Sequence, residues 1–226
     1  MMISILVPVF NEKNTILEIF KKIQESPLLK EIIVVDDAST DGTREILKNL
    51  NNPSILCLYH DKNFGKGAAI RTALAQAKGE IILIQDADLE YDPKDYAQLL
   101  EPILDGRADV VYGSRFLGGP HRVLFFWHFA ANKFFTLFTN ILYNINLTDM
   151  GTCYKVFRSN VLKSMELKSN RFGFEPEVTA KICKKKLRIY ETPISYSGRT
   201  YQEGKKISWS DGLVYFWCLL KYRFIN

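Results

Sequence analysis

Two aspartates separated by a single residue, Asp86 and Asp88, closely follow the apolar run at residues 81–84. Such a run is typical of a buried parallel strand, and ligands bind at the carboxyl ends of these strands in open α/β sheets. The two carboxylates, with Glu90 as a third, could hold Mg²⁺ or Mn²⁺ while phosphate oxygens fill the open positions of the metal. The alternative is that the aspartates only cap the next segment, which is a common role of this residue.

Two more apolar runs, at residues 3–7 and 31–35, also end in polar side chains. Asn11 and Glu12 follow the first run, and Asp37 follows the second. Because the carboxyl ends of parallel strands share one edge of a sheet, three polar clusters there favour a nucleotide site. Asp37 suits the ring N–H groups or ribose hydroxyls of a nucleoside, and the alternative is that it caps the turn that follows it.

Three basic residues suit an anionic ligand. Lys66 lies in a Gly-Lys-Gly tripeptide before a predicted helix, where backbone N–H groups also attract anions, although the spacing is not that of a Walker motif. A flexible turn is the alternative. Arg115 and Arg122 enclose a glycine-containing loop after the predicted strand 109–113, and arginine suits phosphate. For both arginines, a surface ion pair is the alternative.

Strands alternate with helices along the first half of the chain, which predicts an α/β fold with a mostly parallel sheet. The 226 residues, 47% hydrophobic and 24% charged, fit one large globular domain. The predicted strands are 3–7, 31–35, 55–59, 81–84 and 109–113, with a loop at 8–12 after the first strand. The predicted helices are 15–25, 43–50, 68–77 and one that begins near 92.

The net charge of +5 is uneven, because basic residues gather in the last fifth of the chain. This suggests an anionic partner, either phosphate groups or an acidic membrane surface, and a solvated basic face is the alternative. Four scattered cysteines indicate reduced thiols in a cytosolic protein. Neither a signal peptide nor an apolar window of roughly 20 residues is evident, so we expect the chain not to cross a membrane by itself.

The segment 123–147 is rich in phenylalanine and is interrupted by a polar stripe. The stripe recurs every four residues: His128, Asn132, Thr136, Asn140 and Asn144. Such a helix either packs on its own protein or lies in a bilayer interface, and the broad apolar arc favours partial membrane contact. The aromatic and basic tail at 207–224 leaves the same two options, an interfacial anchor or a docked helix.

In order along the chain, these stretches resemble the successive motifs of family 2 glycosyltransferases with the GT-A fold. The resemblance is to the dolichol-phosphate mannosyltransferase-like branch, which includes bacterial polyprenyl-phosphate sugar transferases. The motifs are residues 5–12, 34–43, 63–67, 86–88, 113–116, 148–158 and 199–206. Each motif alone is a weak signal, but the ordered set covers essentially the whole chain and is highly specific.

The resemblance implies a single GT-A domain over 1–226, with a Rossmann-like, mostly parallel central sheet flanked by helices and with amphipathic membrane-facing helices. Its parts would be a nucleotide-sugar-binding half at 1–113, an acceptor half at 114–206 and a basic aromatic C-terminal helix at 207–226. The donor would be a nucleotide-diphosphate sugar, and the acceptor a polyprenyl phosphate. A Mg²⁺ or Mn²⁺ ion would bind at Asp86, Asp88 and Glu90.

The resemblance also assigns site residues. The expected catalytic residues are Asp88, Arg115 and Arg199. Pro8, Phe10, Glu12 and Asp37 would line the nucleoside pocket. The full expected substrate-binding set is Pro8, Phe10, Glu12, Asp37, Lys66, Asp86, Ala87, Asp88, Arg115, Arg122, Arg199 and Lys205.

The chain departs from this family pattern in three ways. Glu90 stands where the best-known mannosyl members have glutamine, and Phe10 where many members have tyrosine, so the sugar and the base are not transferred from them. The pair of spanning helices at the C-terminus of many bacterial relatives is also absent from this sequence. We therefore expect peripheral contact with the cytoplasmic face of a membrane, or contact through a membrane-protein partner, and no nucleic acid.

The acceptor decides which residues the reaction needs. Attack from the face opposite the leaving group would invert the anomeric configuration, and an ionised phosphate acceptor needs no general base. A sugar hydroxyl in polysaccharide or glycan assembly is the alternative acceptor, with Asp149, Glu175 and Glu177 as candidate bases. A non-catalytic membrane-surface protein is a further alternative, which the intact pair Asp86 and Asp88 disfavours.

Overall fold

The computed structural model of the chain describes residues 1–205 and 209–225, without the side chains of 209–211. In this part of the chain, seven strands form one sheet in the order β3-β2-β1-β4-β6-β5-β7. Every neighbouring pair is parallel except the two pairs that β6 makes with β4 and β5. The strands are β1 (Ile3–Val9), β2 (Lys30–Asp36), β3 (Ile55–Tyr59), β4 (Ile81–Ile84), β5 (Val110–Ser114), β6 (Lys155–Arg158) and β7 (Ile189–Pro193). The predicted α/β fold with a mostly parallel sheet is confirmed.

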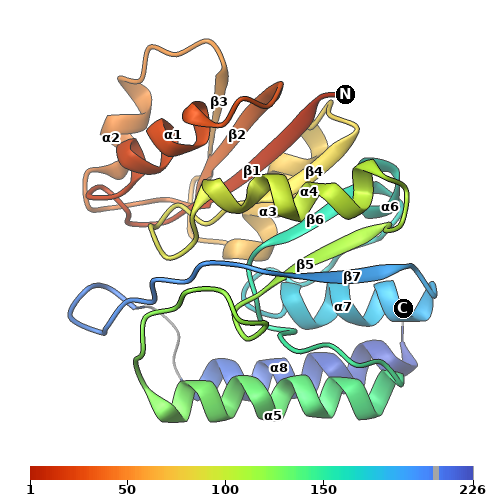
Figure 1. The fold of residues 1–226 in the computed structure, drawn as a ribbon. Coiled ribbons are helices and arrows are strands. Elements are labelled where there is room, and N and C mark those ends of the chain that lie inside the picture. Colours follow the sequence, from red (N-terminus) through yellow and green to blue (C-terminus); the bar gives the residue numbers. More distant parts are fainter. Residues whose placement is uncertain (206–208, 226) are drawn as a thin grey trace.

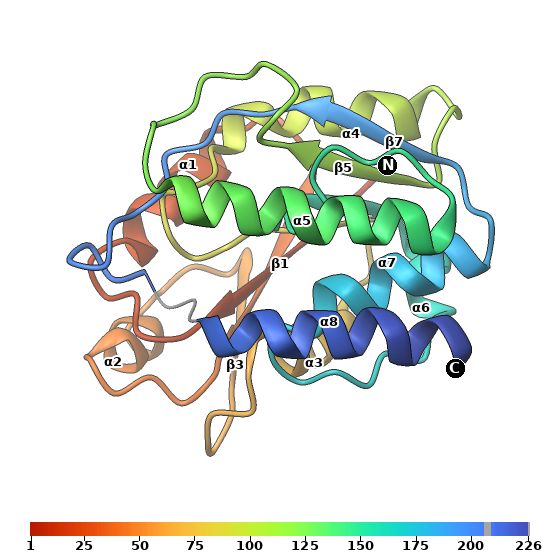
Figure 2. The same cartoon turned by 90° about the horizontal axis from the view of Figure 1, so that it is seen from below.

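The helices lie on both sides of this sheet (Figure 1). They are α1 (Ile16–Glu25), α2 (Thr43–Lys48), α3 (Lys66–Gln76), α4 (Tyr96–Leu104), α5 (Phe126–Tyr143), α6 (Ser159–Lys163), α7 (Phe174–Lys184) and α8 (Trp209–Phe224), with a 3₁₀ turn at Pro93–Asp95 before α4. A layer of α5 and α8 lies below α7 and the sheet, and the two helices run side by side in Figure 2. The predicted boundaries at residues 206 and 207 lie outside the described residues.

Strand β1 continues through two residues that the sequence assigned to a loop. Pro8 pairs with Val35 of β2, whereas β4 pairs with β1 only as far as Leu6. A proline is tolerated where a strand has lost one of its two partners, because its missing N–H then breaks no ladder bond. The loop predicted at 8–12 is therefore wrong for Pro8 and Val9, and the turn begins at Phe10.

Helix α5 turns its polar stripe toward its own protein. Thr136 is buried and its hydroxyl accepts a hydrogen bond from the Met150 N–H at 3.2 Å. Asn140 donates to the Leu147 carbonyl and accepts from the Leu147 N–H, at 2.8 and 2.9 Å. The stripe therefore supplies hydrogen bonds to the loop that follows α5, and the apolar arc is left on the outside.

The outward sides of α5 and α8 form one apolar surface, which we call the apolar base. Its large exposed side chains are Phe126, Trp127, Phe134, Leu137, Ile141, Leu213, Val214, Phe216 and Trp217. Trp127 is 80% exposed and Ile141 is 73% exposed, so this face has no covering within the described chain. Among the described helices, none has the length and apolar content needed to cross a membrane.

Lys155 on β6 is fully buried, which is rare for a lysine. Its ammonium donates to the Met150 carbonyl at 3.2 Å and to the Thr152 carbonyl, and it lies 4.6 Å from the centre of the Tyr112 ring. Burial lowers the pKa of Lys155 to about 8, against the opposing effect of nearby Glu175. This lysine fixes the loop at 150–153, and it does so at an electrostatic cost.

That cost predicts a pH dependence of stability. An unfolded lysine has a pKa of about 10.4, so between pH values of about 8 and 10 the unfolded chain binds more protons than the folded chain. Lys155 therefore makes the free energy of unfolding rise with pH in this window, by on the order of 2 kcal/mol. Lys155→Met should remove this rise. Urea unfolding of both proteins at pH values of about 7.5 and 9.5 tests it, and an unchanged pH dependence in the variant would contradict it.

Candidate functional site

Five carboxylates meet at the carboxyl edge of the sheet, and two cations bind them. Glu12 follows β1, while Asp86, Asp88 and Glu90 follow β4. Glu175 lies in the first turn of α7. The cations that contact these carboxylates are Arg199, from the loop after β7, and Lys66, from the first residue of α3. Five separate parts of the fold therefore position the site.

Arg199 binds three of the carboxylates at once. Its guanidinium donates to Asp88 Oδ2 at 2.6 Å and to Glu12 Oε2 at 3.0 Å. Its backbone N–H donates to Glu90 Oε1 at 2.7 Å. Burial opposes the charge of Arg199, but Asp88 and Glu12 outweigh it and raise its pKa. The carboxylates thus hold the loop after β7 against the end of β1.

Lys66 joins the other two carboxylates. Its ammonium lies 2.8 Å from Asp86 Oδ1 and 3.3 Å from Glu175 Oε1. It also contacts the Cys153 sulfur at 3.1 Å. Burial disfavours the ammonium, yet Asp86 raises the pKa of Lys66 well above its usual value, and Lys66 in turn lowers the pKa of Asp86 against the effect of burial. This pair is therefore ionised in the folded chain.

Asp88 is the carboxyl group whose ionisation its surroundings oppose most. Its side chain is buried, and burial raises its pKa to about 8, with further contributions from Asp86 and Glu90. Arg199 lowers the pKa but does not compensate for these neighbours. Oxygen ligands with surplus negative charge are the donor set that Mg²⁺ and Mn²⁺ prefer, so Asp86 and Asp88 fit a divalent cation.

Glu90, the third predicted metal ligand, contacts the loop at 196–199. Its Oε2 accepts from the Tyr196 hydroxyl at 2.9 Å, and its Oε1 accepts from the Arg199 N–H. In the described part of the chain, no three acidic, histidine or cysteine side chains already form a metal cage. A cation at Asp86 and Asp88 would therefore take its other ligands from water or from phosphate, as Mg²⁺ usually does.

Asp37 holds a loop in place. Its carboxylate accepts from the Phe64 N–H at 2.9 Å and the Gly65 N–H at 2.7 Å, and it pairs with His60 Nδ1 at 2.7 Å. It does not cap the turn that follows it. Asp41 does so by accepting from the Thr43 N–H at 3.0 Å. Asp37 thus fixes the start of α3 beside the end of β2.

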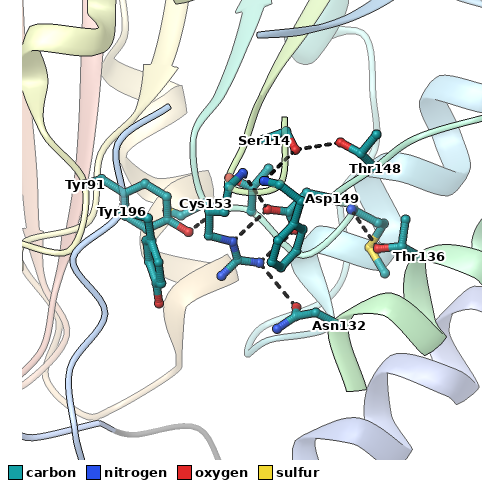
Figure 3. Close-up of polar contacts among 12 residues, drawn as sticks. Tyr91, Ser114, Asn132, Thr136, Thr148, Asp149, Cys153 and Tyr196 are labelled. Carbon is teal, nitrogen blue, oxygen red and sulfur yellow. Dashed lines mark hydrogen bonds and ion pairs between the residues drawn. The ribbon is translucent and has the colours of Figure 1, made fainter. Parts of the chain in front are cut away.

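Arg115 is buried in an ion pair with Asp149 (Figure 3). Its Nε and one terminal nitrogen donate to the two Asp149 oxygens at 2.7 and 2.8 Å, which is a bidentate pair. The same terminal nitrogen reaches Asn132 of α5 at 3.2 Å, and the guanidinium lies 5.1 Å from the centre of the Tyr196 ring. Arg115 therefore connects α5, one of the two helices of the apolar base, to the loop at 196–199 that binds Glu90.

The remaining predicted residues lie around this centre. Arg122 forms an exposed ion pair with Glu203 at 2.9 Å, which is the surface alternative that the sequence left open. Burial lowers the pKa of Lys205, and the neighbouring cations Arg115 and Arg199 contribute. Ala87 is buried and its carbonyl accepts from the Thr15 hydroxyl at 3.0 Å.

Pro8 lies in the last paired part of β1, which ends at Val9, and Phe10 begins the turn beyond it. Two site residues were missed by sequence reasoning. Cys153 contacts Lys66, and Tyr196 contacts Glu90. Cys153 lies within the 148–158 motif, so the sequence could have indicated it as a site residue. Tyr196 lies outside every motif, and nothing in the sequence indicated it.

Residues 4–165 match the family described as Glycosyl transferase family 2. An undecaprenyl-phosphate mannosyltransferase of Micrococcus luteus is 27% identical over 216 residues, which cover 91% of this chain and 87% of that protein. A dolichol-phosphate mannosyltransferase of Pyrococcus furiosus is 28% identical over 91% of this chain, and the match spans only 59% of that longer protein.

The fold also matches a solved structure. A glucosyl-3-phosphoglycerate synthase from Mycobacterium tuberculosis, in complex with Mn²⁺ and UDP-glucose, superposes with a TM-score of 0.76. The match covers 100% of this chain and 80% of that chain at 19% identity, which shows a shared fold. With the family match extending over more than half of the sequence, the chain belongs to glycosyl transferase family 2 and is a glycosyltransferase.

Proposed function

We propose that this glycosyltransferase moves a sugar, with inversion, from a nucleotide-diphosphate sugar to a polyprenyl phosphate at a membrane surface. The observation that supports it most is the outward apolar face of α5, a helix whose polar side binds Arg115 of the site. This arrangement suits a lipid acceptor, because the lipid chain and the reacting phosphate must be bound on neighbouring surfaces. The names of the relatives, both of them polyprenyl-phosphate mannosyltransferases, support the same acceptor.

The donor half in this proposal is residues 1–113. Asp86 and Asp88 would hold Mg²⁺ or Mn²⁺, which supplies charge neutralisation for the departing nucleoside diphosphate. Arg199 contacts one Asp88 oxygen at 2.6 Å and also donates to Glu12, so a cation at Asp88 would use the other oxygen or replace this contact. Either way, the guanidinium would lie beside the donor's phosphates. A nucleoside pocket lined by Pro8, Phe10, Glu12 and Asp37 remains part of the proposal.

The acceptor half is residues 114–206, and two of its three candidate bases, Asp149 and Glu177, are already bound, which favours a phosphate acceptor. A sugar hydroxyl needs a general base, but Asp149 has both oxygens on Arg115. Glu177 accepts from the N–H groups of Lys168 and Ser169 and pairs with Lys181. An ionised phosphate needs no base, only cations that position it. Arg115, Arg199 and Lys205 are the candidates.

Membrane attachment in the proposal is peripheral, on the cytoplasmic face, through the apolar base. The aromatic side chains there, Trp127 and Trp217 among them, suit the depth of lipid headgroups. Lys221 and Arg223 in the last turn of α8 would add attraction to anionic lipid. A membrane-protein partner could cover the same face, and the net charge gives no reason to invoke nucleic acid.

The donor site is tested by two carboxylate variants. Asp88→Asn should abolish Mn²⁺-dependent binding of a nucleoside diphosphate and lower sugar transfer to polyprenyl phosphate by at least about a hundredfold, because the amide removes a charged metal ligand. Glu177→Gln should keep transfer in the folded protein. The Glu177 oxygens are already bound by the N–H groups of Lys168 and Ser169 and by the Lys181 ammonium, so this residue has a structural role. Transfer is measured with a panel of nucleotide sugars and a polyprenyl phosphate.

The Glu177 variant is the matched control for this test, since it also neutralises one buried carboxylate. It should lower the free energy of unfolding, because Lys181 loses its partner at 2.7 Å. Full transfer by the Asp88 variant would contradict the metal site. Absence of transfer by the wild type from every nucleotide sugar would overturn the proposed function itself.

The apolar base is tested by flotation with anionic liposomes. Replacing Leu137 and Ile141 of α5 with serine removes two side chains that are 60% and 73% exposed. The fraction bound should fall at least about tenfold, because burying one such side chain contributes about 1.5–3 kcal/mol. The matched control replaces Leu29 and Leu104, which are 69% and 54% exposed away from this surface, with serine.

The control pair should float like the wild type, because a membrane that contacts α5 and α8 does not reach it. Equal loss in both double variants would mean that binding follows general surface hydrophobicity and not the apolar base. Wild-type protein that fails to float with any liposome would argue for a protein partner on this face instead.

A further inference from the structure

We infer that Glu175 accepts a hydrogen bond from a hydroxyl group of the donor's sugar, and that it selects among sugars by that contact. The inference rests on the proposed function for its donor, a nucleotide-diphosphate sugar. It gives Glu175 a role that differs from the general base considered for a hydroxyl acceptor. Here the Glu175 side chain only accepts a hydrogen bond from the sugar, and no proton is transferred.

The first observation is an unsatisfied oxygen. The Glu175 side chain is 4% exposed, and its Oε2 is buried without a hydrogen-bond partner among the residues that the structure describes. A buried carboxylate oxygen without a donor costs free energy, and such groups are usually satisfied by protein, water or ligand. Because Oε1 is held by Lys66 at 3.3 Å, the carboxylate is fixed in place with one oxygen available.

The second observation is the position of this oxygen beside the donor-phosphate site. Lys66 contacts Glu175 at 3.3 Å and Asp86 at 2.8 Å, so a single ammonium separates Glu175 from a carboxylate that we assign to the metal. A sugar whose diphosphate binds at Asp86 and Asp88 therefore lies within reach of α7. A sugar hydroxyl is the donor group that such a ligand would offer to Oε2.

The third observation is the contrast with Glu177, which is two residues further along α7. Glu177 is fully buried, and its oxygens receive the Lys168 N–H at 2.8 Å, the Ser169 N–H at 2.7 Å and the Lys181 ammonium at 2.7 Å. Both acids favour the start of a helix through the macrodipole. Glu177 interacts with the helix dipole in this way while its oxygens are hydrogen-bonded. The helix dipole therefore does not explain why Glu175 Oε2 has no hydrogen-bond partner within the described residues.

A second unsatisfied polar group, a hydroxyl, lies in the loop that contacts Lys66. Thr152 Oγ1 is buried without a partner in the described chain, and the next residue, Cys153, contacts Lys66 at 3.1 Å. A polyhydroxylated ligand supplies several donors and acceptors at once, which suits a site with more than one unsatisfied group. A site built to bind a hydroxyl rejects an analogue without it more strongly than an apolar pocket does, because its polar group is then left unpaired.

The test uses Glu175→Gln and donors that lack single hydroxyl groups. Binding with Mn²⁺ is measured by titration calorimetry for UDP, UDP-glucose and GDP-mannose, and for the deoxy form of the better donor at each ring position. The wild type should bind one of the deoxy sugars at least about tenfold more weakly than the parent sugar, the loss expected for one charge-assisted hydrogen bond. The Glu175→Gln variant should show less than about a threefold difference for that same position.

Two comparisons separate this role from a merely structural one. Glu175→Gln should bind UDP with Mn²⁺ as the wild type does, because the free nucleotide carries no sugar. Glu177→Gln should keep the wild-type preference for the parent sugar over its deoxy form. If Glu175→Gln weakens UDP and UDP-sugar equally, or keeps the full deoxy discrimination, the inference is overturned. These binding measurements need no acceptor, so they stand apart from any failure of sugar transfer to polyprenyl phosphate.

Discussion

The site depends on a shortage of positive charge at one edge of the sheet. Five carboxylates from three parts of the chain meet there, and the two cations Lys66 and Arg199 form ion pairs with them. Asp88 shows the imbalance, because its pKa rises to about 8 although Arg199 lies 2.6 Å away. A folded protein tolerates such a surplus where a bound cation can relieve it. The ion pairs of Arg199 with Glu12 and Asp88 hold the loop after β7 against the end of β1.

The first five strands of the sheet were predictable from sequence, whereas β6 and β7 were not. Apolar runs such as 81–84 are buried on both faces, so their composition alone identifies them as strands. β6 begins with a buried lysine and ends with Arg158, and β7 is a half-exposed edge strand that ends in a proline. Their pairing is decided by contacts with distant strands, which no local pattern records.

The sequence predicted which residue types lie at the site more reliably than it predicted the contacts that those residues make. Asp86 and Asp88 lie on the expected edge, but a sequence does not show which oxygens are already bound by the protein. Glu90 is bound by the loop at 196–199, and Arg115 is bound by Asp149. The direction of α5 shows the same limit. A four-residue polar repeat separates two faces of a helix, and the loop at 147–150 decides that the polar face points inward.

Arg199 reaches Glu12 across 187 residues of sequence. A ribosome makes the amino-terminal strands first, and domains tend to fold as they emerge. Glu12, Asp88 and Glu90 are therefore synthesised long before the arginine that binds all three. During this interval Lys66 is already present as the partner of Asp86, but the arginine counter-ion of the other three carboxylates is not. A truncation before residue 199 would leave these three carboxylates without Arg199, and the acidic edge of the sheet would then attract free cations.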